Sequence, residues 1–368
     1  MRICLNLLMI LVLVPGSSWA YTLVECGAGN IQKWGSNSVT VRASATSFPS
    51  GSSWRTALQE TITSWNRNPS QMRFTLQFGD TSVGFGNFQN EIWFTTDDFI
   101  LGGASARASM VYDCFGNVRE SDIFIDSRIA LTTSTSKRSS SAYGGTRRPF
   151  QTLAGHELGH TLGLNHTANT YNIMGEDKKH VTTNGSRARF YAGEDASHGL
   201  VRLYGTRTTV QDLGVVHWRR SGSLNGYSSH SRTRMFNTSN SQLDVNTINN
   251  EPHYRVRRGS QVRVEFSYEN NGASRQRTTD TNFYVSTNDF ISTADRRIGS
   301  RNLDLGRNTV YTSRTTLTIP RDLSTTRPCP NSTRTGCYWI GAIVDADGSL
   351  TEVNESNNAS YIGIRVVP

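Results

Sequence analysis

The sequence predicts two structural units in series, an α+β unit over residues 21–205 and an all-β sandwich over residues 253–368, joined by residues 206–252 as a linker or as the start of the second unit. Strand-like runs alternate with two helix-period segments up to Gly205, and beyond it helix signals stop and period-two runs separated by turns follow. Charged residues make up only 18% of the 368 residues, whereas Ser, Thr, Asn and Gly are abundant, which favours strands and turns.

The first unit is expected to contain a twisted mixed sheet with long helices. Trp54, Leu58, Ile62 and Trp65 recur at helical spacing, which predicts a helix over residues 52–65, capped by Ser52 or Ser53. Short strands are predicted at residues 39–41, 72–78, 91–94, 109–112 and 122–125. The Ser-, Thr- and Arg-rich residues 132–149 are predicted to be a loop that leads into a second helix starting near Phe150.

The second unit is predicted from short alternating runs. Val262 to Phe266 alternates cleanly, and the sequence Asn270-Asn271-Gly272 then marks a turn. Further strands are predicted at residues 283–285, 311–319, 337–344 and 361–367. Such a series of short strands closes as a β-sandwich.

Residues 1–20 have the pattern of a secretory signal peptide. Arg2 precedes an apolar run over residues 3–14, and the small-residue site Ser18-Trp19-Ala20 predicts cleavage after Ala20. A membrane anchor, the alternative, needs about 18 or more uninterrupted apolar residues, and this run is shorter and contains Asn6. We therefore expect a secreted, extracellular protein without a membrane span.

The formal net charge of +9 comes almost entirely from arginine, since the lysines are only Lys33, Lys137, Lys178 and Lys179. The arginines are scattered through both halves of the chain and form no stripe. This distribution favours general attraction to acidic surfaces over a nucleic-acid partner.

The stretch from His156 to His166 carries the chemistry. On a helix, residues four apart share a face, so the imidazoles of His156 and His160 converge on one point. Gly163 lets the chain leave the helix with positive φ, so that His166 supplies a third nitrogen. Three neutral imidazoles on Zn²⁺ leave a fourth position for water, and Glu157 is placed to act on that water as a general base. The predicted reaction is peptide-bond hydrolysis.

A methionine supports the same prediction. The sequence Asn172-Ile173-Met174-Gly175 predicts a tight turn that places the Met174 thioether under the metal site as an apolar floor.

With these motifs, residues 34–205 resemble the metzincin zinc endopeptidases. The resemblance implies that His156, His160 and His166 are zinc ligands, that Glu157 is the catalytic base and that Met174 is the Met-turn residue. It also implies a mostly parallel sheet beside two long helices, with an antiparallel edge strand above the cleft. The candidate edge runs from Ala104 to Tyr112, and an extended substrate could add to it as a strand; its first residues are Ala104, Ser105, Ala106 and Arg107.

Two further features refine the resemblance. Glu194-Asp195, followed by residues 200–205, looks like the closing helix of the matrixin-type catalytic domain. The wall of the pocket beside the scissile bond is expected to come from residues 175–192.

The C-terminal half resembles the CARDB domain, an immunoglobulin-like adhesion or binding module of exported prokaryotic proteins. The resemblance rests on Asn270-Asn271-Gly272, residues 284–288, residues 344–348 and residues 352–358, and it implies a bacterial source and a cell-surface or matrix ligand. The acidic residues Asp345, Asp347, Glu352 and Glu355 could bind Ca²⁺ through hard oxygens, or they could form an Asp-Gly hairpin turn and a polar strand entrance.

Four cysteines remain after the predicted cleavage, and two disulfides are expected in an oxidising destination. Cys329 and Cys337 bracket a short loop and are predicted to pair locally, which leaves Cys26 to pair with Cys114. The alternative is that a Cys26 thiolate ligates the catalytic metal and keeps the enzyme latent.

Two functions are carried forward. The first is a secreted zinc endopeptidase that acts on proteins or peptides and carries a β-sandwich binding module. The second is a surface-binding or adhesin protein whose metzincin domain is catalytically silent. Glu157 favours the enzyme, because a scaffold would need only the histidines.

Overall fold

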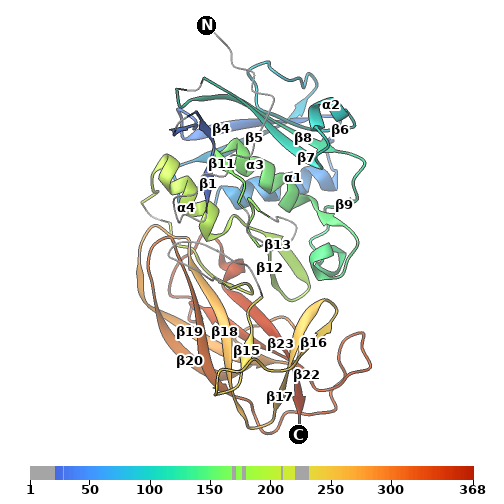
Figure 1. Ribbon diagram of the computed structural model, residues 1–368, viewed down its shortest axis with the longest axis vertical. Coiled ribbons are helices and arrows are strands. Elements are labelled where there is room, and N and C mark those ends of the chain that lie inside the picture. Colours follow the sequence, from blue (N-terminus) through green and yellow to red (C-terminus); the bar gives the residue numbers. More distant parts are fainter. Residues whose placement is uncertain are drawn as a thin grey trace.

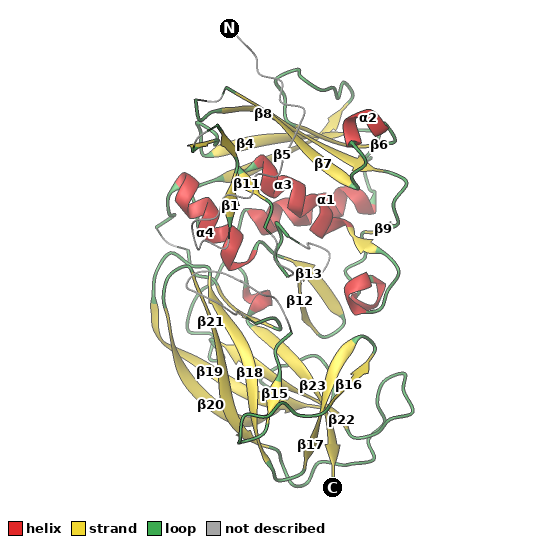
Figure 2. Cartoon of the chain, viewed as in Figure 1, coloured by secondary structure: helices red, strands yellow, loops and turns green. Residues whose placement is uncertain are grey.

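The computed structural model describes residues 21–27, 29–113, 115–167, 171–175, 180–208, 210–219 and 232–368. Figures 1 and 2 show a sheet at one end of the molecule, a layer of helices beneath it, a small hairpin beneath the helices, and an all-β unit at the other end. The coarse fold prediction, an α+β unit followed by an all-β unit, is confirmed. The predicted signal peptide, residues 1–20, lies outside the described residues.

The sheet of the first unit has five strands in the order β5-β4-β6-β8-β7. β4, β5, β6 and β8 pair in parallel, and β7 pairs antiparallel with β8 at the edge. The bounds are β4 Ser38–Ser44, β5 Arg73–Asp80, β6 Glu91–Thr95, β7 Ala106–Tyr112 and β8 Val118–Asp126. All five predicted strands are therefore present.

Two longer helices, α1 and α3, pack on one face of this sheet, and a third, α4, lies in the same helical layer (Figure 2). α1 (Ser53–Trp65) begins at Ser52, whose Oγ accepts a hydrogen bond from the backbone N–H of Arg55 at 3.2 Å, as expected of a cap. α3 (Phe150–Thr161) starts where the sequence predicts, and α4 (Gly193–Tyr204) covers the predicted closing helix. Leu58, Trp65 and Leu158 are fully buried in the core between helices and sheet.

Short elements connect these layers. They are β1 Thr22–Leu23, β2 Glu25–Cys26, β3 Asn30–Ile31, α2 Asp98–Leu101, β9 Leu131–Thr132, β10 Arg148–Pro149 and β11 Leu164–Asn165, with 3₁₀ turns at Lys137–Ser139 and Ser141–Tyr143. The hairpin β12 (Val181–Asn184) and β13 (Arg187–Phe190) lies between the helices and the second unit (Figure 1).

The second unit consists of two sheets around one apolar core. One sheet pairs β18 with β14, β15 and β21, and the other has the order β16-β17-β23-β22-β19-β20. The bounds are β14 Leu213–Val216, β15 Met235–Phe236, β16 Val245–Ile248, β17 Glu251–Arg257, β18 Gln261–Asn270, β19 Gln276–Ser286, β20 Arg296–Leu305, β21 Thr309–Thr318, β22 Cys337–Val344 and β23 Ala359–Val367, with a 3₁₀ turn at Glu355–Asn357.

Residues 206–252 contribute strands to this second unit. β14 pairs antiparallel with β18, and β16 pairs with β17. Sequence reasoning did not identify β14, β15, β16, β17 or β20. β20 is a sheet edge with the largely polar sequence Arg-Arg-Ile-Gly-Ser-Arg-Asn-Leu-Asp-Leu, so it lacks the apolar alternation by which the other strands were found.

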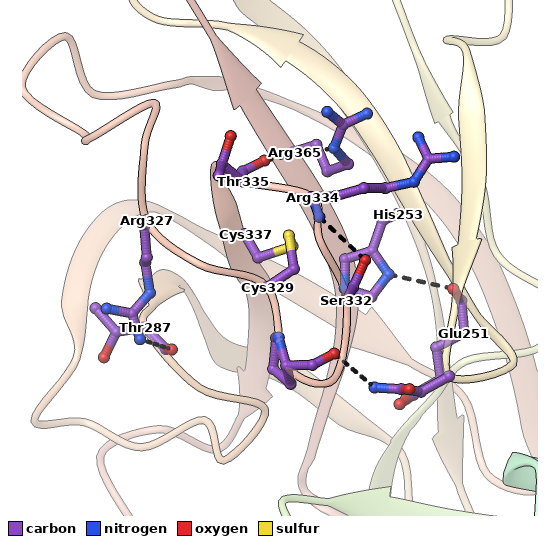
Figure 3. Close-up of a disulfide and its surroundings, with 12 residues drawn as sticks. Glu251, His253, Thr287, Arg327, Cys329, Ser332, Arg334, Thr335, Cys337 and Arg365 are labelled. Atoms are coloured by element: carbon purple, nitrogen blue, oxygen red, sulfur yellow. Dashed lines mark hydrogen bonds between the residues drawn. A yellow bond between two sulfur atoms is a disulfide. The ribbon is translucent and has the colours of Figure 1, made fainter.

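Cys329 and Cys337 form the predicted local disulfide, with their Cα atoms 5.0 Å apart. Figure 3 shows that the bond closes the loop before β22, beside His253 and Glu251 of β17. Arg327 extends from the same loop and donates a hydrogen bond to the carbonyl oxygen of Thr287 at 2.7 Å.

The two units share a buried interface. Tyr191, Val216, Trp218 and Val310 form an apolar cluster there. Lys137 of the first unit is 1% exposed, and its ammonium group contacts Glu251, Asp289 and Tyr361 of the second. No helix in the described part of the chain is long and apolar enough to cross a membrane.

Candidate metal centre

Helix α3 places His156 and His160 on one buried face, and each is 7% exposed. The chain leaves this helix at Gly163, whose φ is +89°. A Cβ atom at that position would lie 2.8 Å from the carbonyl oxygen of Gln32, so the close approach also requires glycine. β11 then brings His166 back toward the helix, on the exposed side of the cluster.

The three predicted ligands meet at one point. The Nε2 atoms of His156, His160 and His166 form a triangle in which each pair is 3.1 Å apart. Zn–N bonds of about 2.0–2.1 Å at tetrahedral angles put nitrogens about 3.3 Å apart, so the triangle has the size of a zinc site. Among the described residues, these histidines are the one His/Cys/Asp/Glu cluster with ligand geometry.

Backbone carbonyl groups orient two of the rings. Nδ1 of His156 lies 2.6 Å from the carbonyl oxygen of Ile173, and Nδ1 of His160 lies 2.8 Å from that of Leu164. A carbonyl can only accept, so each Nδ1 carries the proton and each Nε2 presents a lone pair. The two lone pairs of His156 and His160 face each other at 3.1 Å and cannot hydrogen-bond to one another, and a metal cation between them is the group that satisfies both.

Burial favours the neutral, ligating form of these imidazoles. Desolvation, followed by the positive charges that His156 and His166 would carry, holds the pKa of His160 well below its usual value. Desolvation also lowers the pKa of His166. Neutral nitrogen is the form that binds metal.

Met174 packs directly beneath the helix that carries the triad. Met174 is 1% exposed, and its sulfur packs against the backbone of Gly159. A Cβ atom built on Gly159 would lie only 2.3 Å from this sulfur. Its backbone N–H donates to Oδ1 of Asn172 at 2.9 Å, and its carbonyl oxygen accepts from the N–H of Thr167 at 2.9 Å. Met174 therefore lies where an apolar floor was predicted.

Glu157 and the three histidines line one cleft of about 470 Å³. Glu157 is 5% exposed. The opposite wall comes from the chain before and along β7, including all four predicted edge residues, Ala104, Ser105, Ala106 and Arg107. Ala106 and Arg107 lie within β7, and Ala104 and Ser105 directly precede it.

Sequence reasoning missed three residues of this cleft: Val24, Arg148 and Leu153. Val24 lies in the cleft because β1 pairs antiparallel with β11 and the Val24 N–H donates a hydrogen bond to the carbonyl oxygen of Gly163 at 2.9 Å. No local pattern indicates such a pairing. Leu153 precedes His156 by one helical turn on the same face, a signal that was available in the spacing.

The remaining predicted site residues lie elsewhere. Cys26 is disulfide-bonded, which contradicts the latency alternative, and its predicted partner Cys114 lies outside the described residues. Asp345 accepts hydrogen bonds from Ser349 and Leu350 within a turn, and Asp347 accepts one from Ser349. Glu352 and Glu355 both accept from the Asn358 amide. These carboxylates thus serve turn and loop hydrogen bonds.

Known proteins match both halves of the chain. Residues 33–205 match the family model described as matrixin, and residues 240–361 match that of CARDB. Stromelysin-1 from Rattus norvegicus is 42% identical over 64 residues, which cover 17% of this chain and 13% of that protein. Stromelysin-1 from Mus musculus is 41% identical over the same length and with the same coverage. The chain therefore matches only about an eighth of these relatives' length.

Solved structures of CARDB domains are similar to part of the chain. The crystal structure of a CARDB domain from Pyrococcus furiosus, in complex with di-metal ions, is 15% identical and covers 44% of this chain and 91% of that domain, with a TM-score of 0.26. A solution structure of the same domain gives 15% identity, 44% and 98% coverage, and a TM-score of 0.26. The two family matches thus place the histidine triad within residues 33–205, which match the matrixin family, and residues 240–361 match the CARDB family.

Proposed function

We propose that this protein is a secreted zinc-dependent endopeptidase that hydrolyses extracellular proteins, with its CARDB domain as a binding module for a cell-surface or matrix ligand. The observation that carries the proposal is the triangle of three Nε2 atoms, 3.1 Å apart, in a cleft that also holds the Glu157 carboxylate. The matrixin match supports protein substrates.

The chain supplies distinct groups for the reaction. His156, His160 and His166 would hold the zinc ion. When bound, this ion polarises the substrate carbonyl and lowers the pKa of a water molecule. Glu157 accepts a proton from the attacking water and returns it to the nitrogen of the leaving amine. Its carboxylate is buried in the cleft that the ligands line and is not part of the ligand cluster, so it would act on the water rather than bind the metal.

The cleft favours an extended substrate. β7 is the edge of the sheet and lines the cleft along much of its length. An edge strand offers unpaired backbone groups, and a peptide laid beside it gains main-chain hydrogen bonds whatever its sequence. The peptide bond opposite Glu157 would be the one cleaved.

Casein and a quenched fluorescent peptide test the activity. We expect cleavage that a zinc chelator stops and that added Zn²⁺ restores. Glu157→Gln should lower kcat by about 10²–10⁴-fold, the usual worth of a general base, while zinc stays bound. Chelator-insensitive cleavage, or equal activity in the variant, would contradict the proposal. A parent protein that binds stoichiometric zinc and cleaves nothing would favour the alternative, a surface-binding protein with a silent peptidase domain.

Secretion is part of the proposal and rests on residues 1–20. The supporting pattern is the basic residue, the apolar run and the small-residue site that ends at Ala20. Mass spectrometry of the protein from culture medium should give Tyr21 as the first residue. Retention of the full chain inside the cell would contradict it.

A further inference from the structure

We propose that Trp218 of the second unit is a positioning residue of the peptidase site, because it holds the chain segment that orients the metal ligands. This inference rests on the proposed function and assigns the second unit a role inside the site itself. The β12–β13 hairpin likewise has contacts with both units.

Trp218 is fully buried and lies two residues after β14, a strand of the second unit. Its ring stacks on Tyr171 of the first unit, with centroids 5.7 Å apart and planes 11° apart. It also contacts the rings of His180 at 5.1 Å and Tyr191 at 6.1 Å. One side chain of the second unit thus contacts three aromatic rings that flank the Met-turn and the hairpin.

Tyr171 needs such support. Its φ is +55°, a left-handed conformation that is unfavourable for a residue with a large side chain. Its carbonyl oxygen lies 2.7 Å from Nδ1 of His180, so a hydrogen bond joins the two residues that Trp218 contacts. Strained backbone of this kind persists only where the surrounding contacts hold it in place.

The residues of the Met-turn that directly follow Tyr171 contact the ligands and the helix that carries them. Two residues on, the carbonyl oxygen of Ile173 accepts the hydrogen bond that orients the His156 ring. The next residue, Met174, packs against Gly159 between two of the ligands. A shift of Tyr171 would therefore move both the hydrogen-bond partner of His156 and the floor beneath the triad.

The hairpin forms a second connection from the CARDB half to helix α3. The side chain of Asn184 donates to the carbonyl oxygen of Ile291 at 2.9 Å and accepts from the Ile291 N–H at 2.6 Å. The Gly185 N–H donates to the carbonyl oxygen of Asp289 at 2.7 Å. At the other end of the hairpin, the Phe190 ring packs closely against Gly155 of α3, the residue before His156. A Cβ atom built on Gly155 would lie only 2.7 Å from this ring.

The experiment uses the mature, zinc-loaded full chain. Trp218→Ala, Trp218→Leu and Trp218→Phe are compared with the parent for zinc affinity by chelator competition, for the visible spectrum of the Co²⁺-substituted protein, and for kcat and KM separately. Loss of a group that orients metal ligands typically costs about 10–100-fold in metal affinity or activity. We expect a loss of that size for alanine and leucine in zinc affinity or kcat, with KM changed less, and recovery to within a few-fold with phenylalanine, which restores a stacked ring.

Phe266→Leu is the matched control, because Phe266 is equally buried in the core of the second unit and is not part of the cluster around Trp218. It should lower the melting temperature and leave zinc affinity and the Co²⁺ spectrum unchanged. Trp218→Leu retains more apolar volume than Trp218→Ala, so the leucine variant can still be measured if the alanine variant folds poorly.

Two results would overturn the inference: a folded Trp218→Leu protein with parental zinc affinity, Co²⁺ spectrum and kcat, or a Phe266→Leu control that loses zinc affinity equally. Failure of the proposed function can be told apart from failure of this inference. If the parent cleaves no substrate, its zinc affinity and Co²⁺ spectrum can still be measured, and the Trp218 variants either change these two properties or leave them unchanged.

Discussion

Gly159 sets how closely the Met-turn approaches the ligand-bearing helix. It lies between Glu157 and His160 on α3, and a Cβ atom there would meet the Met174 sulfur at 2.3 Å and Trp65 at 3.3 Å. Real Cβ atoms do not come within 2.3 Å of another heavy atom, so any larger residue must displace Met174 or bend the helix.

Gly159→Ala should therefore destabilise the protein. Overpacking costs about 1–3 kcal/mol, and the gain in helix propensity offsets no more than about 1 kcal/mol of it. Urea unfolding and zinc content are the measurements, and we expect both the free energy of unfolding and the zinc affinity to fall. Gly35→Ala is the control, because a Cβ atom at Gly35 has no neighbour within 4 Å. An equally stable Gly159→Ala protein would show that the floor beneath the triad is loose.

Among the elements, β8 combines sheet pairing with a buried pair of acids. Glu120 accepts hydrogen bonds from the backbone N–H groups of Gly86, Asn87 and Phe88, at 2.8, 3.1 and 2.9 Å. Asp122, two residues along the same strand, accepts from the Glu91 N–H at 3.1 Å. Burial, reinforced by the neighbouring Glu120 carboxylate, raises the pKa of Asp122 to about 9.

This raised pKa predicts how stability depends on pH. Asp122 is protonated in the folded protein up to a pKa of about 9 and ionises near 3.8 when unfolded. The folded state therefore binds more protons between these values, and its stability falls as pH rises from about 4 to about 9. Asp122→Asn keeps the group neutral, so its melting temperature should fall less between pH 5 and pH 9 than that of the parent.

Asp98→Asn is the control for this comparison. Its ion pair with Arg128 lowers the pKa of Asp98, so the stability from that pair is lost only at acid pH. Burial also raises the pKa of Asp195, Asp212, Glu269 and Glu352, to about 7, 7, 8 and 8, so the parent curve has several contributors. Parallel curves for the parent and Asp122→Asn would contradict the role assigned to Asp122.

For the whole molecule, one buried cation joins the two units. The ammonium group of Lys137 lies 3.1 Å from the Glu251 carboxylate and 2.5 Å from the Tyr361 hydroxyl, and it also contacts Asp289. Glu251 is 4% exposed, so it has little water to replace a lost partner. The loop that carries Lys137 also pairs with the hairpin, through the bond from the Lys137 N–H to the carbonyl oxygen of Ser186 at 2.7 Å.

Lys137→Met should weaken the junction of the two units. Removing one partner of a buried ion pair typically costs about 3–5 kcal/mol. Glu251 would keep the partly exposed Arg138 guanidinium at 3.1 Å and the Tyr361 hydroxyl at 2.6 Å, so we expect a loss at or below the lower end of that range. Urea unfolding measures the loss, and adding Glu251→Gln should recover part of it. Arg119→Ala removes a surface ion pair with Asp113, which water and salt screen, and should cost much less. A similar small loss for Lys137→Met would show that the junction does not depend on this cation.

Local patterns were enough to predict much of the molecule. The helix periods of α1 and α3, the Ser52 cap, the convergence of His156 and His160, and the Cys329–Cys337 disulfide all arise within a few residues of sequence. Each depends on short-range geometry, the 3.6-residue turn above all, and that geometry is the same in any fold.

The long-range partners came only from the tertiary structure. Val24 reaches the cleft through β1 pairing with β11, β14 joins the second unit by pairing with β18, and Trp218 reaches the Met-turn from the opposite half of the chain. A fully buried tryptophan has the same sequence signature whether it lies in a core or against a metal site. Its role depends on which surfaces meet when the two units pack, and no local periodicity encodes that contact.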